Sequence, residues 1–420
     1  MRKKESLRKY GLTLGLSFCL LLYLMGAKSL PMSKAAPKSF SITVAAGSVD
    51  RREAIVSFTL PAELAGNSYG LREASGRLIP LQIDAPRRAT FVLLELKAGA
   101  KKDFVLETVK PDAASVAQGI QLAKEGDRLK ITAAGRRVLE YLGQPGELPR
   151  PEIKPIFRRG GYIHPVYTPS GRVITGDYPP DHIHHHGVWF AWTKTEFEGR
   201  HPDFWNMGDA TGTVEFVALD ETWSGAVQSG FRARHRYVDL SAPTPKTVLN
   251  EIWEVMVYRG GQGAKAYSMF DLVSTQECAT SSPLVLPEYR YGGVAFRGPS
   301  HWLGKDNATF LTSEGKGRDD GNATNARWCH IGGQVDGQLV GIAVLCHPNN
   351  FRAPQPLRIH PNEPYFNFAP SVAGQWEIAP GKPYVSKYRY VVYDGPPDVA
   401  ELDRLWNDYA NPPQVTITAK

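Results

Sequence analysis

The sequence predicts an all-β protein, with a small amino-terminal β-sandwich followed by a much larger β-sandwich. Short runs rich in Val, Ile, Phe, Tyr and Thr recur along the chain, separated by Gly, Pro, Asn and Asp. Many runs alternate apolar and polar residues, as in residues 213–216 (TVEF), which predicts sheets with one buried and one hydrated face. Helical periodicity is scarce until the last part of the chain. Together these observations favour packed antiparallel sheets.

The predicted strands fall into two groups. A small β-domain is expected over residues 38–115 and a large one over residues 125–410, with residues 112–119 as the linker. A Pro-rich connector, residues 145–155, then leads to a histidine-rich region. The expected strands are 39–45, 54–60, 90–96, 104–109, 129–133, 212–219, 231–240, 247–258, 266–274, 339–346 and 384–393.

One short helix is predicted near the carboxyl terminus, from Asp398 to Tyr409. Asp398 can cap its first turn, because a side-chain oxygen at this position accepts a hydrogen bond from a free backbone N–H. Leu402, Leu405, Trp406 and Tyr409 recur at helical spacing and predict one apolar stripe that packs on a sheet.

Residues 1–27 are predicted to be an export signal, with a basic start followed by the apolar run 12–25. Cleavage is expected after Ala27 or near residues 35–36. The apolar run is shorter than the roughly 20 residues that a spanning helix needs, and a retained amino-terminal anchor is the alternative. No later stretch predicts a membrane span. The protein is therefore expected to be exported, in the periplasm or outside the cell; the sequence does not predict its oligomeric state.

The formal net charge of +7 does not indicate a nucleic-acid partner. Residues 1–27 contain five basic residues and one acidic residue, so residues 28–420 retain a net charge of only +3. The basic residues of that part are scattered rather than clustered.

Three cysteines remain beyond the signal: Cys278, Cys329 and Cys346. This sparse and odd number excludes a disulfide scaffold and allows at most one bridge. No Cys/His spacing typical of zinc sites is present, so buried free thiols are expected.

The densest cluster of reactive side chains is His182, His184, His185 and His186, which follow the turn-forming residues 177–181. In an extended chain His182, His184 and His186 would share one face, and His185 would point the other way. Three imidazoles on one side can bind a divalent transition metal such as zinc, copper or iron. The spacing from Gly176 matches the opening of the cupin metal motif, but Val188 and Trp189 stand where that motif has glutamate.

Two other interpretations of the histidine cluster remain open. The imidazoles can carry protons or donate hydrogen bonds to a polar substrate, because histidine titrates near neutral pH. Alternatively, they have a structural role and bond the backbone of a loop bent by Pro179 and Pro180.

A second candidate region is 287–298, where a Tyr291-Gly292-Gly293 turn separates Glu288 from Arg297. Glu288 facing a histidine would form an acid–base pair suited to sugar or carbonyl chemistry, and Arg297 would orient an oxygen-rich substrate. The alternative is a bulged hairpin in which Arg297 pairs with Glu288.

The third candidate region contains two His-Pro-Asn triplets, which begin at His347 and His360. The loops around them combine polar and aromatic residues, a composition common in ligand clefts. Phosphate-binding loops, the serine-nucleophile elbow, HExxH and dinucleotide fingerprints are absent from the sequence, which argues against nucleotide-dependent catalysis.

Three motifs carry a resemblance to a known family: residues 164–171 (HPVYTPSG), 177–182 (DYPPDH) and 185–192 (HHGVWFAW). With Tyr291-Gly292-Gly293 and residues 393–395 (YDG), they resemble bacterial proteins catalogued as the PmoA family, or methane oxygenase PmoA-like proteins. The resemblance covers residues 125–410. Methane monooxygenase subunits of that name are multi-span membrane proteins, so the name does not imply that activity here.

The chain also resembles the galactose-mutarotase-like supersandwiches, whose late strand carries a Pro-Gly like that of residues 380–388. This resemblance implies a large galactose-mutarotase-like sandwich after the small domain. Residues 360–367 are similar to the His-Pro-Tyr-Phe-Asn segment of sugar epimerases, but three residues are inserted after Pro361. We therefore transfer no catalytic role from that family.

The sequence thus predicts an exported protein that binds or processes a carbohydrate or sugar-derived compound, with a small molecule or glycan as its partner. A lyase, hydrolase or epimerase-like activity is one form of this prediction. A metal-dependent oxygenase or hydrolase using His182, His184 and His186 is one alternative, and a non-catalytic sugar-binding protein is another. The predicted catalytic residues are His182, His184, His186 and Glu288. The predicted substrate-binding residues are His164, Tyr167, His185, Trp189, Tyr291, Arg297, His347, His360, Asn362 and Tyr365.

Overall fold

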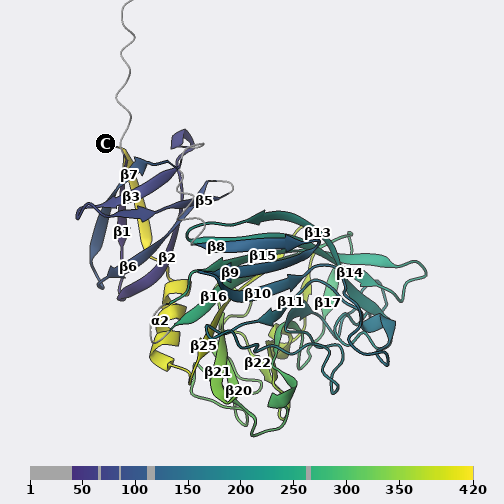
Figure 1. The fold of residues 1–420 in the computed structure, drawn as a ribbon. Coiled ribbons are helices and arrows are strands. Elements are labelled where there is room, and N and C mark those ends of the chain that lie inside the picture. The colour runs from purple at the N-terminus through teal and green to yellow at the C-terminus, as the bar shows by residue number, and fades with distance from the viewer. Residues whose placement is uncertain (1–39, 65–67, 85–86, 111–118, 262–265, 420) are drawn as a thin grey trace, which may run out of the picture. The chain divides into compact units, whose positions relative to one another are not determined.

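The computed structural model describes residues 40–64, 68–84, 87–110, 119–261 and 266–419 (Figure 1). The predicted export signal and nearly all of the predicted linker lie outside these ranges. The all-β prediction is confirmed: within them the chain forms antiparallel sheets and one α-helix, besides short 3-10 turns. None of the described helices is long and apolar enough to cross a membrane.

The amino-terminal strands form a five-stranded and a three-stranded sheet. Residues of β1 alternate between buried and partly exposed, and Ile42 and Val44 join Val56 and Phe91 in one apolar core. The five-stranded sheet has the order β26 (Gln414–Ala419), β1 (Phe40–Ala45), β7 (Lys101–Thr108), β3 (Tyr69–Glu73), β4 (Leu78–Pro80). The three-stranded sheet has the order β2 (Arg51–Thr59), β6 (Arg88–Leu96), β5 (Gln82–Asp84).

The carboxyl-terminal strand β26 is an unpredicted member of the first sheet. It runs antiparallel to β1 from Phe40↔Ala419 to Ala45↔Gln414 (Figure 1). Val415 and Ile417 pack against the same apolar core as β1. The two ends of the described chain therefore meet in one sheet.

Two eight-stranded sheets form the larger part of the fold. One has the order β22 (Leu357–Ile359), β23 (Tyr365–Phe368), β18 (Gly293–Arg297), β12 (Val188–Ala191), β11 (Tyr162–Val166), β10 (Arg136–Leu142), β9 (Arg128–Ala133), β8 (Ile120–Glu125). The other has the order β13 (Gly212–Trp223), β14 (Gln228–Asp239), β15 (Lys246–Tyr258), β16 (Tyr267–Cys278), β25 (Tyr384–Asp394), β21 (Gln338–Cys346), β20 (Trp328–Val335), β19 (Ala308–Thr312). A separate pair joins β17 (Leu284–Leu286) to β24 (Trp376–Ile378).

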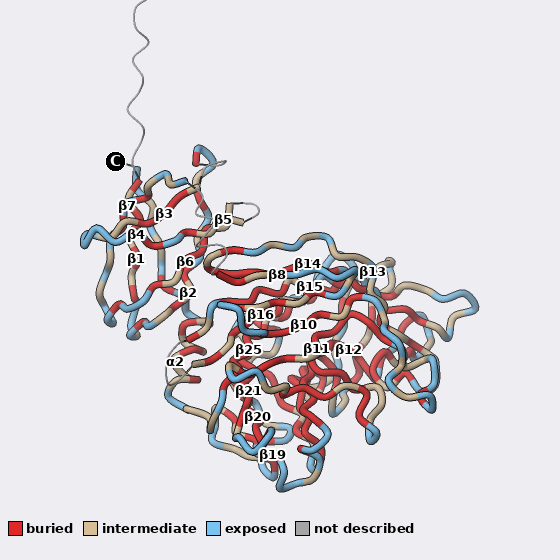
Figure 2. The backbone as a smooth tube through the Cα atoms, viewed as in Figure 1, coloured by how far each residue is buried: buried red, intermediate tan, exposed pale blue. Residues whose placement is uncertain are grey.

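The two large sheets share one apolar core. Trp189 and Phe190 of β12 belong to the same buried cluster as Trp253 of β15 and Leu272 of β16. Both sheets are accordingly buried along most of their strands (Figure 2). This is the sandwich arrangement that alternating strands predict.

The predicted terminal helix is confirmed as α2 (Val399–Ala410). The Asp398 carboxylate accepts a hydrogen bond from the Glu401 N–H at 3.1 Å. Leu402 and Leu405 are buried in a cluster with Trp328 and Tyr393, so the helix covers the second large sheet on the side away from the main core.

Cys278, Cys329 and Cys346 are free thiols, as expected. Cys329 and Cys346 are buried, whereas Cys278 is partly exposed. Burial raises the pKa of Cys346 to about 12, so this thiol is unreactive at neutral pH.

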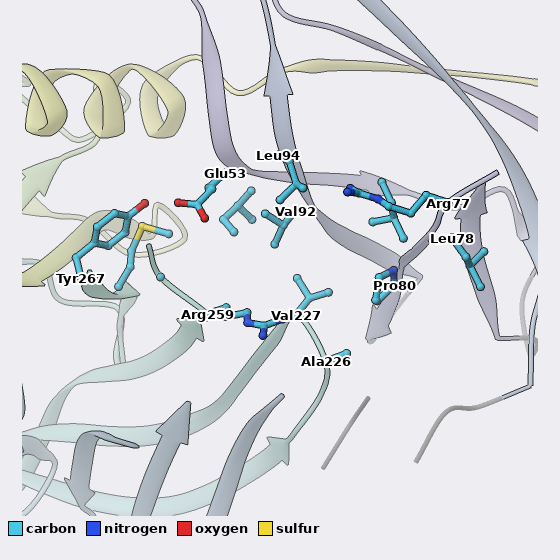
Figure 3. A pocket seen from close by; sticks show the side chains of 14 residues that line it. Glu53, Arg77, Leu78, Pro80, Val92, Leu94, Ala226, Val227, Arg259 and Tyr267 are labelled. Carbon is cyan, nitrogen blue, oxygen red and sulfur yellow. The ribbon is translucent and has the colours of Figure 1, made fainter. Parts of the chain in front are cut away.

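A cavity of about 210 Å³ lies beside β2, β4 and β6 and is mostly aliphatic (Figure 3). Its charged lining residues are Glu53, Arg77 and Arg259, and no histidine or cysteine is among its lining residues. This cavity is therefore mainly an apolar surface, with Glu53 as the one carboxylate of its lining.

Candidate functional site

Sheet order brings three distant segments together at one end of the first large sheet. Strand β12 pairs with β18 (Val188↔Phe296), and β18 pairs with β23 (Arg297↔Tyr365). The residues just before β12, at the end of β18 and just before β23 therefore meet. A cavity of about 70 Å³ lies there, lined by His182, His184, His185, Trp205, Asn206, Arg290, Tyr291, Arg358, His360 and Tyr365.

The histidine segment is a turn rather than an extended strand. The His185 N–H donates to the His182 carbonyl at 2.8 Å, and the Tyr178 N–H donates to the His185 carbonyl at 3.1 Å. The ring centroids of His182 and His185 are 4.8 Å apart, and those of His184 and His185 are 4.7 Å apart. The predicted grouping of His182, His184 and His186 on one face is wrong, because alternation holds only for an extended backbone.

His186 belongs to a different, buried cluster. Its Nδ1 lies 2.7 Å from an Asp177 carboxylate oxygen, and its ring stacks on Tyr162 at 4.3 Å. The Tyr162 hydroxyl donates to the same carboxylate at 2.9 Å. Burial lowers the pKa of His186. His186 is neither a lining residue of the cavity nor placed to share a ligand with His182.

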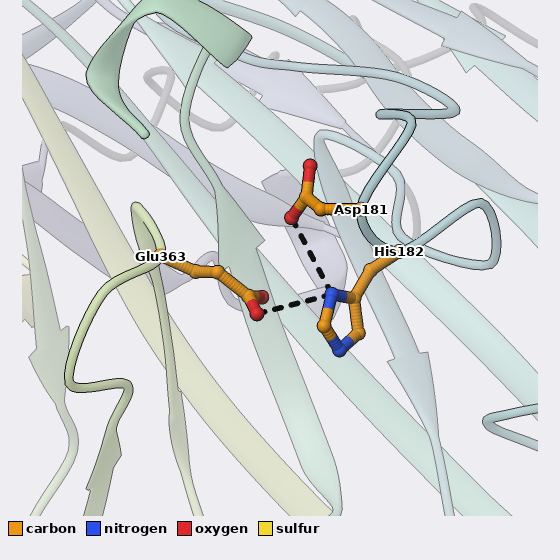
Figure 4. Close-up of side chains that lie close together, drawn as sticks. All are labelled: Asp181, His182 and Glu363. Carbon is orange, nitrogen blue, oxygen red and sulfur yellow. Dashed lines mark hydrogen bonds and ion pairs between the residues drawn. The ribbon is translucent and has the colours of Figure 1, made fainter. Parts of the chain in front are cut away.

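His182 and Glu363 form a pair at this site (Figure 4). The His182 Nδ1 lies 3.1 Å from Glu363 Oε1 and 3.4 Å from Asp181 Oδ2. The second ring nitrogen is on the side away from both carboxylates. Carboxylates at Nδ1 favour the tautomer with hydrogen on that nitrogen, which leaves Nε2 as a proton acceptor.

His360 completes the polar surroundings of Glu363. The Glu363 N–H donates to His360 Nδ1 at 3.1 Å, so a neutral His360 carries its hydrogen on Nε2. That nitrogen lies 3.3 Å from Glu363 Oε1. Two imidazoles thus lie beside one carboxylate, whose own side chain is only 8% exposed.

Arg297 is fully buried and joins the two carboxylates. Its Nη2 donates to Asp181 at 2.6 and 2.8 Å, and its Nη1 donates to Glu363 at 3.1 Å. The same Nη1 lies 3.2 Å from His185 Nδ1. Arg297 is therefore a positioning residue, although the sequence suggested that it would bind substrate. The alternative pairing of Arg297 with Glu288 is also wrong.

The structure does not bring Glu288 to the histidines. Its side chain is exposed, it is not a lining residue of the cavity, and it forms no ion pair within the described ranges. Glu363 occupies the position that was predicted for Glu288. Glu363 directly follows the His360-Pro361-Asn362 triplet, but nothing in its local sequence distinguishes it from other loop carboxylates.

Burial keeps most imidazoles of the cavity neutral. It lowers the pKa of His184 to about 3 and that of His360 to about 4, and it lowers the pKa of His185 well below its usual value. Burial likewise raises the pKa of Glu363. Burial alone would also raise the pKa of Asp181. Hydrogen bonds from His182 and Arg297 outweigh this effect and lower the pKa of that carboxyl.

Aromatic side chains hold the histidines in place. The His185 ring packs against Trp189 at 5.0 Å and against Tyr365 at 4.8 Å, measured between ring centroids. The Tyr291 hydroxyl donates to Asn206 Oδ1 at 3.2 Å. Trp189 is fully buried behind His185, so it supports the site without lining it.

Four other predicted substrate residues lie outside the cavity. His164 Nδ1 is 2.9 Å from the Thr175 hydroxyl, and the Tyr167 hydroxyl donates to Glu140 at 3.0 Å. His347 packs edge-on against Tyr409 of α2, with centroids 4.9 Å apart. Asn362 is exposed beside the site and is not a lining residue.

The structure thus groups His182, His184, His185, Tyr291, His360 and Tyr365, all of which the sequence selected. It adds Trp205, and also Asn206 and Arg358, which no pattern indicated. It also adds Arg290, which lies inside the selected segment 287–298 without being chosen for a role.

The described residues contain one group of three candidate metal ligands, Asp181, His182 and Glu363, whose ligand atoms lie within 4.8 Å of one another. Both carboxylates already pair with Arg297 at 2.6 and 3.1 Å. A guanidinium at these oxygens opposes a cation at the same place. The arrangement fits hydrogen-bonded acid–base chemistry better than metal ligation.

Comparisons with solved structures give two distant likenesses. Two solved structures from Enterococcus faecalis are distantly similar. A protein in the glycosyl hydrolase family 38 matches with 9% identity and a TM-score of 0.43, over 91% of this chain and 47% of that one. An alpha-mannosidase of strain V583 matches with 11% identity and a TM-score of 0.41, over 91% of this chain and 46% of that one.

The chain therefore spans about half the length of these two proteins, with shares of 47% and 46%. No curated protein matches it. Residues 128–407, which contain the whole site, match a family of unknown function, DUF6807, and the chain belongs to that family.

Proposed function

We propose that this protein binds a carbohydrate or sugar-derived compound at the histidine-lined cavity and that His182, held by Glu363, moves a proton on it. The observation that carries this proposal is the contact of 3.1 Å between His182 Nδ1 and Glu363 Oε1 at the wall of the cavity. The predicted export signal makes this an activity outside the cytoplasm.

The other lining groups suit a hydroxyl-rich ligand. Within the described residues neither ring nitrogen of His184 has a hydrogen-bond partner, and its low pKa keeps it neutral and able both to donate and to accept. Asn206 and the half-buried Tyr291 add amide and phenol groups. A few placed polar groups among aromatic rings are typical of sugar sites.

The chemistry follows from the His182 tautomer. Glu363 and Asp181 lie at Nδ1 and favour hydrogen on that nitrogen, so Nε2 can take a proton from a sugar hydroxyl or from a carbon next to a carbonyl group. The imidazolium that forms is stabilised by the two carboxylates. The same group can return the proton to a leaving oxygen or to another carbon, which are steps common to lyases, hydrolases and epimerases.

The test is turnover of a glycan panel by His182→Ala and Glu363→Gln variants. Loss of a positioned acid–base group costs about 10²- to 10⁴-fold in kcat, so both variants should show losses of that order with an unchanged circular dichroism spectrum. Glu288→Gln is the matched comparison, because that carboxylate is exposed and away from the cavity.

Two outcomes would contradict the proposal. Normal turnover in His182→Ala would exclude the acid–base role, and sugar binding without turnover across the panel would favour a non-catalytic binding protein. About one equivalent of bound metal, with activity lost on chelation, would favour the metal-dependent oxygenase or hydrolase instead. The likeness to PmoA-like proteins and to mutarotase-like sandwiches stays a prediction.

A further inference from the structure

We infer that the cavity is a subsite for the carboxylate of an acidic sugar, a uronate, with Arg358 as its principal partner and Arg290 as the second. This inference deepens the proposed function and rests on it only for the sugar part of the ligand. It is carried by charge, by an unpaired buried donor and by size.

Charge is the first observation. The lining residues include two guanidinium groups, Arg290 and Arg358, and no Asp or Glu. The nearest carboxylates, Asp181 and Glu363, are already paired with Arg297. Even with both of these ionised, the three arginines outnumber them. A site with this balance selects an anion.

Arg358 is the second observation. It lies on β22, and its Nη1 has one weak acceptor, Asn322 Oδ1 at 3.3 Å. Its Nε is buried and has no hydrogen-bond partner, and it forms no ion pair in the described part of the chain. A buried N–H without an acceptor is costly, and this guanidinium, which lines the cavity, has donors left for the acceptor of a ligand.

Arg290 supplies the second guanidinium from another segment of the lining. It precedes β18, it is exposed, and it too lacks an ion pair among the described residues. Its Cζ lies 5.6 Å from the Tyr291 ring centroid, so the cation lies beside an aromatic side chain of the same cavity. Guanidinium groups bind carboxylates through paired, charge-assisted hydrogen bonds.

Size decides which part of the ligand enters. The cavity measures about 70 Å³, whereas pockets that hold a whole drug-sized ligand measure roughly 300–1,000 Å³. It therefore holds a compact group such as a carboxylate, and a sugar ring must remain at the mouth. The His182 side chain is 35% exposed, so it can contact a sugar ring at the mouth of the cavity.

This placement gives the proton transfer a specific site. A carboxylate in the cavity brings the adjacent carbon, C5 of a uronate, beside His182. His182 Nε2 takes the C5 proton, and the electron pair of the C–H bond moves into the carboxylate, where the arginines stabilise the added charge. The C4–O bond then breaks and the C4=C5 double bond forms, while the leaving oxygen takes the proton. This elimination needs no co-reactant.

The test compares binding of oligogalacturonate with binding of the matching neutral galactose oligomer, by calorimetry on the full exported chain. We expect the uronate to bind at least about tenfold tighter at low salt, which is the gain expected of one paired charge contact. Arg358→Gln should remove this preference. Arg234→Gln is the control, because Arg234 is 50% exposed and pairs with Asp220 on the other large sheet. Equal affinity for the two oligomers, or an unchanged preference in Arg358→Gln, would overturn the inference.

A sulfated galactose oligomer identifies the anion. Tighter binding of the sulfated sugar than of the uronate would overturn the carboxylate assignment. The inference and the proposed function fail in different ways. A uronate preference that depends on Arg358, with no turnover in any variant, leaves the anion subsite standing and removes the acid–base role. His182-dependent turnover of neutral sugars without a uronate preference leaves the acid–base role standing and removes the anion subsite.

Discussion

Arg297 organises the site at the scale of single residues. It is fully buried, and its guanidinium joins Asp181 from the histidine loop to Glu363 from the loop before β23. Since these carboxylates in turn hold His182 Nδ1, the orientation of the proposed base depends on a residue that does not line the cavity. A buried charge of this kind tolerates loss of its partner poorly.

Replacing Arg297 with Gln should destabilise the fold by about 3–5 kcal/mol, because the buried carboxylate of Glu363 loses its cation. Arg234→Gln should cost at most about 1 kcal/mol, because that pair with Asp220 is exposed. Chemical denaturation of both variants measures the difference. Similar free energies of unfolding would mean that the Asp181–Arg297–Glu363 contacts contribute little.

At the scale of elements, the strand pair β20–β21 depends on two glycines that leave room for a buried ring. Gly332 is opposite Gly341 in this pair, and the buried ring of His330 covers both positions. The His330 ring is also held by Tyr393, whose hydroxyl lies 2.6 Å from Nδ1. A methyl group on either glycine therefore meets a ring that cannot move aside.

Gly341→Ala should destabilise the protein by about 1–3 kcal/mol, the usual cost of overpacking a core. Its added Cβ would lie 2.5 Å from His330 Cε1. Gly146→Ala is the control, because no atom lies within 4 Å of its added Cβ. Thermal melting of the two variants provides the measurement, and equal melting temperatures would show that the His330 ring can shift.

Pairing of β1 with β26 matters at the scale of the whole molecule. Strand β26 covers one edge of β1, and residues 40 and 419 are partners. Deleting residues 412–420 should leave β1 with an open edge and expose the core around Val415 and Ile417.

The deletion should therefore speed amide hydrogen exchange in β1 and β7 while exchange in β15 and β16 stays slow. Exchange read by mass spectrometry tests this directly. Unchanged protection of β1 would mean that β26 adds nothing to the stability of the sheet.

Buried histidines should also make the whole protein sensitive to acid. Burial lowers the pKa of His330 to about 3 and that of His184 to about 3, whereas unfolded histidine titrates near about 6.5. Between these values the unfolded chain binds more protons than the folded one, so stability is complete above about pH 6.5 and falls as pH drops toward 3.

Melting temperatures between pH 7 and pH 4 check this expectation. A His330→Gln variant should melt lower at pH 7 but lose less stability on acidification than the parent. Parallel pH profiles for the two proteins would contradict the assignment to His330.

Local sequence patterns were sufficient for the fold class, because alternation and helical spacing reflect which face of each element is buried. They predicted strands such as β15 and β25 within a few residues, and α2 with its Asp398 cap. They also selected the histidine region and the segments before β18 and β23. Each of these predictions concerns a short run of neighbouring residues.

Only the tertiary structure shows which residues of neighbouring strands and loops contact one another at the site. Asp181, Arg297 and Glu363 meet only because β12, β18 and β23 are neighbours, and strand order is not encoded in any one strand. His186 lies apart from His182 and His184 because the segment forms a hydrogen-bonded turn at His185 rather than an extended strand. The sequence by itself determined which side chains were available for chemistry. The tertiary structure decided which of them share a cavity, because that choice depends on contacts between residues more than a hundred positions apart.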